Sequence, residues 1–299
     1  MRFDFGFYSS ILLIFFVHGF IYAILLLRKA KQNDTKAEKW LAFFLFLCIL
    51  YISPWMLGFA GWYDNQPYRD FLFYVPTQQM LLMGPVVFLY LQSLLNPTFT
   101  LTRKDYWHFL PAGLYFLFSL VMFVTDKLIL KKYFFLASGA DPDFDFWYQL
   151  VGFLSMLIYF LLSLRYYNVY RKMIVQLVSY ADLVLFKWIR NFLQAFLLML
   201  LLKLAFYVLS IPFPNLEGYV GNWWYFFAFS LIFYYIAITG YSNSVTSRLS
   251  FKVNDLWQQR PQFLISYPPE IKETNHEDII DVDFVPIADE SGSADFEPG

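Results

Sequence analysis

The sequence predicts an all-α fold: a polytopic membrane protein with seven transmembrane helices. Hydrophobic residues make up 59% of the 299 residues and charged residues only 15%, whereas about a quarter of the residues in a typical soluble domain are charged. The mean hydropathy is +0.48, and the apolar residues form long continuous stretches. This composition excludes a soluble enzyme and a nucleic-acid-binding domain.

Seven apolar stretches are long enough to cross a bilayer, which takes a helix of about 20 residues. Water is absent from the hydrocarbon core, so each crossing must satisfy its own backbone hydrogen bonds. A transmembrane barrel would instead show alternating segments of about 10 residues. The predicted spans are residues 7–27, 40–60, 71–95, 107–125, 146–164, 191–211 and 222–241.

The positions of lysine and arginine predict the orientation, because these residues gather on the cytoplasmic side of membrane proteins. Sixteen of the 22 basic residues follow the first, third, fifth or seventh predicted span, five lie on the opposite side, and Lys203 lies inside the sixth span. We therefore expect an outside amino terminus, a cytoplasmic carboxyl terminus and a multi-pass position in the cell (inner) membrane. The predicted parts are a seven-helix transmembrane domain, residues 1–245, and a cytoplasmic tail, residues 246–299.

The tail changes in composition at about residue 268. Residues 270–299 hold ten acidic residues and one basic residue, Lys272. We expect this segment to be largely disordered, because it has too little apolar surface to fold alone. Within it Ile280, Val282 and Phe284 alternate with aspartates, and they would form one apolar face against the sheet edge of a partner. This segment has two interpretations. It is either a peptide that binds a cytoplasmic protein or an inert tail.

Two loops carry patterns of their own. From Ile174 to Trp188 apolar residues recur at spacings of three and four, which predicts a helix that lies along the inner membrane surface or extends the fifth span. On the other side, Asp141, Asp143 and Asp145 resemble the start of a calcium loop, but the glycine and glutamate that an EF-hand needs at positions 6 and 12 are missing. Capping of the helix that forms the fifth span explains these acids instead.

Residues typical of enzymes are scarce. The three histidines, His18, His108 and His276, lie far apart in the sequence, and no metal-ligand spacing, glycine-rich phosphate loop or nucleophile elbow is present. The sequence therefore predicts no catalytic residues, no metal site and no cofactor, and we expect that the chain is not an enzyme.

Lys203 is the residue that an apolar span explains least, because a lysine near mid-membrane costs about 3 kcal/mol on the insertion scale. With a rise of about 1.5 Å per residue, its depth matches that of Gln78, Gln79 and Trp55 in other spans. One interpretation is an outward-opening pocket in which Lys203 attracts a small anionic or carbonyl-bearing ligand and the glutamines orient it. The other is an interhelical hydrogen-bond cluster that stabilises the bundle, with Lys203 reaching water or Glu217.

Prolines interrupt two of the predicted spans. Pro54 lies in the second span, and Pro76 and Pro85 lie in the third. Proline removes a backbone donor and bends a helix. The pair Gly84 and Pro85 therefore predicts a kink that could serve as a hinge.

Four segments share a pattern with one known family. The longest are GPVVFLYLQSL at 84–94 and RKDYWHFLP at 103–111, and the shorter ones are KWLA at 39–42 and the segment 182–190, which ends in KWIR. They resemble passages of bacterial membrane-bound AraC-type transcription regulators, which join a seven-helix sensor-like domain to a cytoplasmic helix-turn-helix domain. The likeness covers roughly residues 7–251.

The chain departs from that family after residue 251. No paired amphipathic helices with a tight turn follow, and the tail is acidic where contact with phosphates needs positive charge. The resemblance therefore implies a sensor-like membrane module without direct nucleic-acid binding, which relays a signal to a cytoplasmic partner such as a transcription regulator. A small-solute transporter and a structural membrane scaffold remain as alternatives. The sequence leaves the oligomeric state open, a homodimer included.

Overall fold

The computed structural model describes residues 4–96, 99–137, 139–175, 183–216 and 218–243. The predicted partner-binding residues Ile280, Val282 and Phe284 lie outside these ranges, as does Glu217. Every regular element in the described ranges is helical, which confirms the all-α prediction. Six of the described helices are long and apolar enough to cross a membrane, as in a multi-pass membrane protein.

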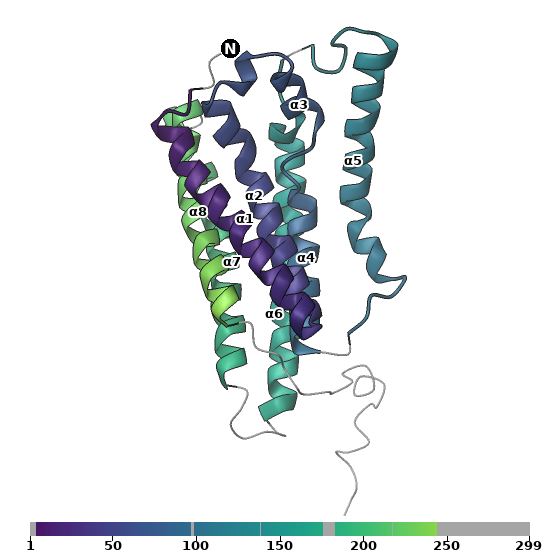
Figure 1. The fold of residues 1–299 in the computed structure, drawn as a ribbon, viewed down its shortest axis with the longest axis vertical. Helices are drawn as coiled ribbons and strands as arrows, with labels where there is room; N and C mark the ends of the chain where they lie inside the picture. Colours follow the sequence, from purple (N-terminus) through teal and green to yellow (C-terminus); the bar gives the residue numbers. More distant parts are fainter. Residues whose placement is uncertain (1–3, 97–98, 138, 176–182, 217, 244–299) are drawn as a thin grey trace, which may run out of the picture. The chain divides into compact units, whose positions relative to one another are not determined.

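The described residues form eight α-helices, and the longest connection, between α5 and α6, contains η3 and η4 (Figure 1). Their bounds are α1 Phe7–Asn33, α2 Lys36–Phe59, α3 Tyr68–Tyr74, α4 Met80–Leu95, α5 Leu110–Phe123, α6 Phe146–Val175, α7 Leu183–Ser210 and α8 Tyr219–Ser242. The five short helical elements are η1 Trp62–Asp64, η2 Asp105–Phe109, η3 Val124–Ile129, η4 Pro142–Phe144 and η5 Pro214–Leu216.

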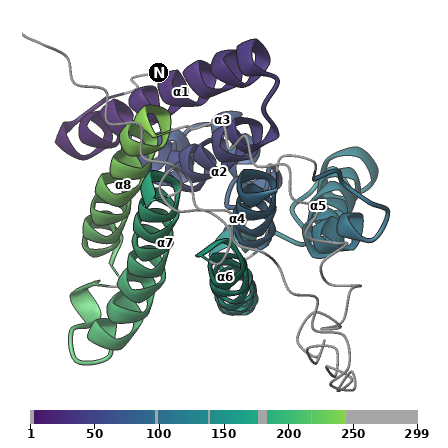
Figure 2. The same ribbon diagram turned by 90° about the horizontal axis from the view of Figure 1, so that it is seen from below.

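Helix α2 is the centre of the bundle. It packs against α1, α4 and α8, and Figure 2 shows it between these helices when the bundle is viewed along its length. Most of its residues are buried, among them Phe44, Tyr51 and Trp55. Helix α5 lies at the edge, and its outer side chains, such as Phe116 and Leu117, are exposed and apolar. A helix that is apolar on its exposed side suits contact with lipid.

The structure corrects the prediction of one continuous helix over residues 71–95. Helix α3 ends at Tyr74 and α4 begins at Met80, and residues 75–79 between them are not helical. Proline disfavours the helical conformation in the residue before it, and Val75, which precedes Pro76, is extended at φ −92° and ψ 113°. With 16 residues, α4 is about 24 Å long, which is shorter than the hydrocarbon core of about 30 Å.

The predicted hinge at Gly84 and Pro85 lies inside the continuous helix α4. A Cβ atom on Gly84 would lie 2.9 Å from the Tyr159 ring, and one on Gly152 would lie 2.7 Å from the Cβ of Met80. These glycines let α4 and α6 approach closely, as small residues do in membrane bundles. Gly84 therefore has a packing role, and the hinge stays a prediction.

The predicted helix from Ile174 to Trp188 begins inside α6 and ends inside α7. Helix α6 continues to Val175, eleven residues beyond the predicted fifth span, which ends at residue 164, and α7 already begins at Leu183. The residues between them lie outside the described ranges. Only residues 174 and 175 of the predicted segment belong to α6, and residues 183–188 belong to α7, so both interpretations of this segment stay predictions.

Candidate functional site

The break between α3 and α4 is held by one carboxylate. Asp143 Oδ2 accepts hydrogen bonds from the backbone N–H groups of Thr77 and Gln78, at 2.8 and 2.9 Å, and from the Thr77 hydroxyl at 3.2 Å. Its Oδ1 accepts one from the hydroxyl of Tyr115 on α5 at 2.5 Å. Unwound backbone leaves N–H groups without helical partners, and a buried N–H without a partner is costly. Asp143 supplies the acceptors that permit the break.

This arrangement corrects the prediction that the three aspartates cap the helix of the fifth span. Asp141 caps the short element η4 instead, since its Oδ1 accepts from the backbone N–H of Asp143 at 3.0 Å. Asp143 is buried against the break, and only Asp145 is exposed beside the start of α6. The carboxylates differ in role because η4 turns successive side chains in different directions.

The two buried aspartates titrate at higher pH than usual. Burial, and next the neighbouring carboxylate of Asp143, raise the pKa of Asp141 to about 7. Burial also raises the pKa of Asp143, although the hydrogen bonds from Gln78, Tyr115 and Thr77 act in the opposite direction. Removal from water disfavours the charged form of a carboxyl group, and two adjacent carboxylates repel each other.

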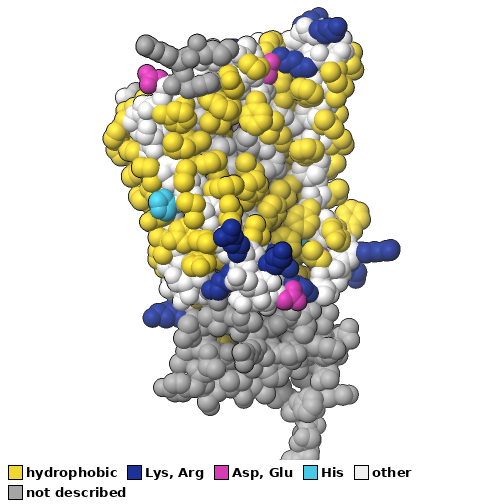
Figure 3. Space-filling model, in the orientation of Figure 1, with side chains coloured by type: hydrophobic (Ala, Val, Ile, Leu, Met, Phe, Trp, Pro, Cys, Tyr) yellow, Lys and Arg dark blue, Asp and Glu magenta, His cyan; other side chains and the backbone are white. Residues whose placement is uncertain are grey.

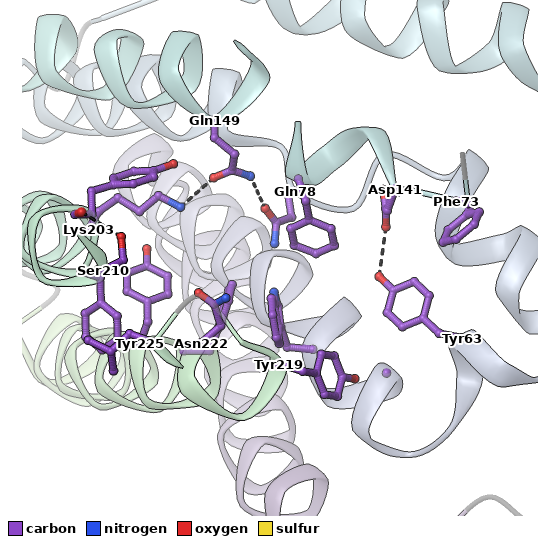
Figure 4. Close-up of a pocket in the computed structure, with 18 of the residues that line it drawn as sticks. Tyr63, Phe73, Gln78, Asp141, Gln149, Lys203, Ser210, Tyr219, Asn222 and Tyr225 are labelled. Carbon is purple, nitrogen blue, oxygen red and sulfur yellow. Dashed lines mark hydrogen bonds between the residues drawn. The ribbon is translucent and has the colours of Figure 1, made fainter. Parts of the chain in front are cut away.

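A chain of hydrogen bonds joins the break to Lys203. Gln149, at the start of α6, donates from Nε2 to Gln78 Oε1 at 2.8 Å and to the Asp143 carbonyl oxygen at 2.5 Å. Its Oε1 accepts from Lys203 Nζ at 2.7 Å. Figure 4 shows the dashed line running from Lys203 through Gln149 to Gln78. The break, α6 and α7 are thus joined by side-chain amides.

Three tyrosine rings surround the ammonium group of Lys203. Its Nζ lies 5.1 Å from the ring centre of Tyr225, 5.3 Å from that of Tyr207 and 5.8 Å from that of Tyr51. It also donates to the Tyr51 hydroxyl at 3.2 Å. Aromatic faces attract cations, so the rings stabilise the charge. No described carboxylate forms an ion pair with Lys203.

Lys203, Gln149 and Gln78 line a cavity of about 860 Å³. The cavity lies at the end of the bundle where α2 and α7 end and where α6 and α8 begin, because its walls include Gly58, Ser210, Gln149 and Tyr219. Figure 4 shows Lys203 at one side of the space and Asp141 with Tyr63 at the other. The further lining residues are Trp55, Tyr63, Asp64, Arg69, Phe73, Gln78, Gly139, Asp141, Phe144, Phe206, Tyr207, Leu216, Asn222, Tyr225 and Phe226.

The structure brings together three of the four predicted ligand-binding residues. Lys203, Gln78 and Trp55 line this cavity. Gln79 is absent from its lining, and its side chain donates to the Pro76 carbonyl oxygen at 2.7 Å. On a continuous helix Gln78 and Gln79 would lie at nearly the same depth. In the non-helical segment the two side chains bind different partners.

Sequence reasoning missed Gln149, Tyr51 and Tyr225. Gln149 is the central member of the chain of hydrogen bonds, and it is buried although polar. The sequence feature that could have identified it is its position, because a glutamine side chain one turn inside a predicted span indicates an interhelical contact. The tyrosines had no comparable signal, because the chain contains 23 of them.

Comparisons with protein families, curated proteins and solved structures find no match. Within the described ranges, no group of three or more histidine, cysteine, aspartate or glutamate side chains could hold a metal ion.

Proposed function

We propose that this chain is a membrane-embedded receptor of the sensor type, which binds a small extracytoplasmic ligand in the cavity and relays the binding to a cytoplasmic protein partner. The observation that carries the proposal is that the wall of the cavity includes the break between α3 and α4. A ligand that contacts Gln78 touches a segment whose conformation depends on a few hydrogen bonds rather than on a helix.

The chain of hydrogen bonds from Lys203 to the break offers a route for a conformational change on ligand binding. Lys203 lies on α7, Gln149 on α6 and Gln78 in the break, and Asp143 joins the break to Tyr115 on α5. A ligand that competes for Lys203 or Gln78 alters one of these bonds, and α4 continues from the break to the other end of the bundle. Because α4 and α6 interlock at Gly84 and Gly152, they would move together.

The proposed orientation places the cavity outside and the tail in the cytoplasm. Most of the described lysines and arginines lie at the end of the bundle opposite to the cavity, where α1 ends and α2 begins, and several are visible on the lower part of the face in Figure 3. This distribution favours that end as cytoplasmic. The resemblance to the membrane region of AraC-type regulators supports a signalling role in the inner membrane. The acidic tail would then bind a separate output protein through Ile280, Val282 and Phe284.

The test has two arms that use the full-length protein in lipid nanodiscs. A metabolite library is screened for compounds that raise the unfolding temperature, and each hit is followed by hydrogen exchange of residues 75–80. We expect a hit to change exchange in this segment, and Ser210→Phe, which fills the cavity rim, to abolish the effect. A library without hits, or hits that leave the segment unchanged, would contradict the receptor.

The second arm addresses the partner. Deletion of residues 275–299 is expected to abolish co-purification of a cytoplasmic protein that is retained by the intact chain. Unchanged co-purification after the deletion would exclude the tail as the docking segment, whereas the ligand arm would be unaffected.

A small-solute transporter is the second candidate, and the break between α3 and α4 also favours it. Discontinuous helices whose unwound segments line the substrate site are typical of secondary transporters. Uptake of a screened hit into vesicles that contain the purified protein would identify a transporter. A scaffold, by contrast, predicts that substitutions at Lys203 change stability alone.

A further inference from the structure

Two buried hydrogen-bond donors in the wall of the cavity lack an acceptor among the described residues. Trp55 Nε1 and Gln78 Nε2 are buried N–H groups with no hydrogen-bond partner in the described part of the protein. Both residues line the cavity, and their exposed fractions are 8% and 0%. Figure 4 shows the Gln78 amide nitrogen on the side away from Gln149. Buried donors of this kind usually have a partner, so these two mark where a bound group belongs.

Two amide oxygens of the same wall already accept a hydrogen bond. Gln149 Oε1 accepts from Lys203, and Gln78 Oε1 accepts from Gln149. Among the described residues that line the cavity, the buried side-chain atoms without a hydrogen-bond partner are both N–H donors. Lys203 adds one positive charge without a described carboxylate beside it. A matching ligand must therefore bring several acceptor lone pairs and one negative charge, which a carboxylate combines in one group.

The rest of the cavity limits the ligand to one such charge. Asp64 and Asp141 line the space together with Arg69, so the far side has no excess of positive charge that would bind a second anionic group. The wall also contains the apolar aromatic side chains of Phe144, Phe206 and Phe226. A volume of about 860 Å³ lies within the range of roughly 300–1,000 Å³ that small-molecule sites occupy.

We infer that the ligand is a small organic monocarboxylate, whose carboxylate accepts hydrogen bonds from Lys203, Gln78 and Trp55 and whose apolar body lies against the phenylalanine side chains. This inference rests on the proposed receptor function and names the ligand class of the same site. The acid can reach the cavity from the water phase or, as a fatty acid, from the membrane.

The experiment measures binding to the full-length protein in nanodiscs by the ligand-dependent rise in unfolding temperature. The acids are phenylacetate, which is water-soluble, and laurate, which partitions into the bilayer. The matched neutral probes are phenylacetamide and lauramide, and phenethylamine carries the opposite charge. We expect at least one acid to bind saturably and its amide to bind at least tenfold more weakly. The acid that binds identifies the source.

Two pairs of variants locate the acid. Lys203→Met is expected to weaken binding of the acid at least tenfold, and Lys187→Met, on an exposed position of the same helix, is its control. Trp55→Phe keeps an aromatic ring but removes the free N–H, so binding should weaken severalfold, and Trp147→Phe, at an exposed tryptophan, is its control. The Trp55 pair still tests the site if the Lys203 variant does not fold.

The alternative outcomes separate the two proposals. Equal binding of an acid and its amide, preferential binding of phenethylamine, or undiminished acid binding by both Lys203→Met and Trp55→Phe would overturn the carboxylate and leave the receptor standing. If no acid binds but other library compounds do, the carboxylate is likewise wrong. If no compound of any class binds, both proposals fail.

Discussion

Replacing Asp143 with alanine should release the break between α3 and α4. The substitution removes the acceptor of two backbone N–H groups, from Thr77 and Gln78, and of the hydroxyls of Thr77 and Tyr115. The hydroxyls can rotate toward other partners. The two N–H groups cannot, because the neighbouring residue Pro76 and the start of α4 fix the backbone.

The expected loss of stability follows from these two donors. A buried donor left without a partner costs about 1–3 kcal/mol, so two of them cost roughly 4 kcal/mol. At roughly 2–4 °C per kcal/mol, the unfolding temperature should fall by about 10 °C. Asp143→Asn retains one carbonyl oxygen toward the backbone, so we expect it to lose only about 1–2 kcal/mol.

Thermal unfolding of the purified variants, combined with hydrogen exchange, checks this reasoning. The amides of Thr77 and Gln78 should exchange faster in Asp143→Ala than in the parent protein. The control is Asp145→Ala, because Asp145 is exposed beside the start of α6 and an exposed acid at a helix amino terminus contributes at most about 1 kcal/mol. If Asp143→Ala unfolds at the same temperature as Asp145→Ala, the carboxylate does not hold the break.

Three other variants test separate parts of the structure. Gly84→Ala should destabilise the protein by about 1–3 kcal/mol in a thermal scan, because its Cβ would lie 2.9 Å from the Tyr159 ring, while Gly113→Ala, with open space around it, should not. Asp141 has a pKa of about 7 in the folded protein and an ordinary pKa of about 4 when unfolded. The folded state therefore binds more protons, and the unfolding temperature should fall as the pH rises from 4 to 7. Asp141→Asn should flatten that profile, and an equally steep profile in the variant would refute the assignment. Gln149→Leu removes both the acceptor of Lys203 and the donor to Gln78, so it should speed exchange at residues 77–79 and cost about 1–3 kcal/mol, whereas Gln66→Leu, at an exposed glutamine, should leave that exchange unchanged.

The positions of most spans were predictable from local composition, and the third was not. In the sequence, Pro76 indicated that the third span could be interrupted, but a proline within a span commonly produces only a kink. Here the chain leaves the helix for five residues, because Asp143 offers acceptors to the freed N–H groups. Asp143 is 66 residues from Thr77, and no local pattern connects them.

The candidate site shows the same division. Depth along each span predicted that Lys203, Gln78 and Trp55 could share a layer, and they line one cavity. The same argument included Gln79, which binds the Pro76 carbonyl oxygen instead, and it omitted Gln149. Depth is a single coordinate, whereas a contact also depends on how each helix is rotated about its axis.

The class of the protein was decided by composition, because the transfer of an apolar stretch of about 20 residues into lipid depends on the stretch itself and hardly on its neighbours. The cavity, the break and the partners of Lys203 were decided by packing. Lys203 contacts Gln149 across 54 residues and Tyr51 across 152 residues. Such contacts form only when the fold brings residues of α2, α6 and α7 together, because a hydrogen bond requires its two atoms within about 3 Å.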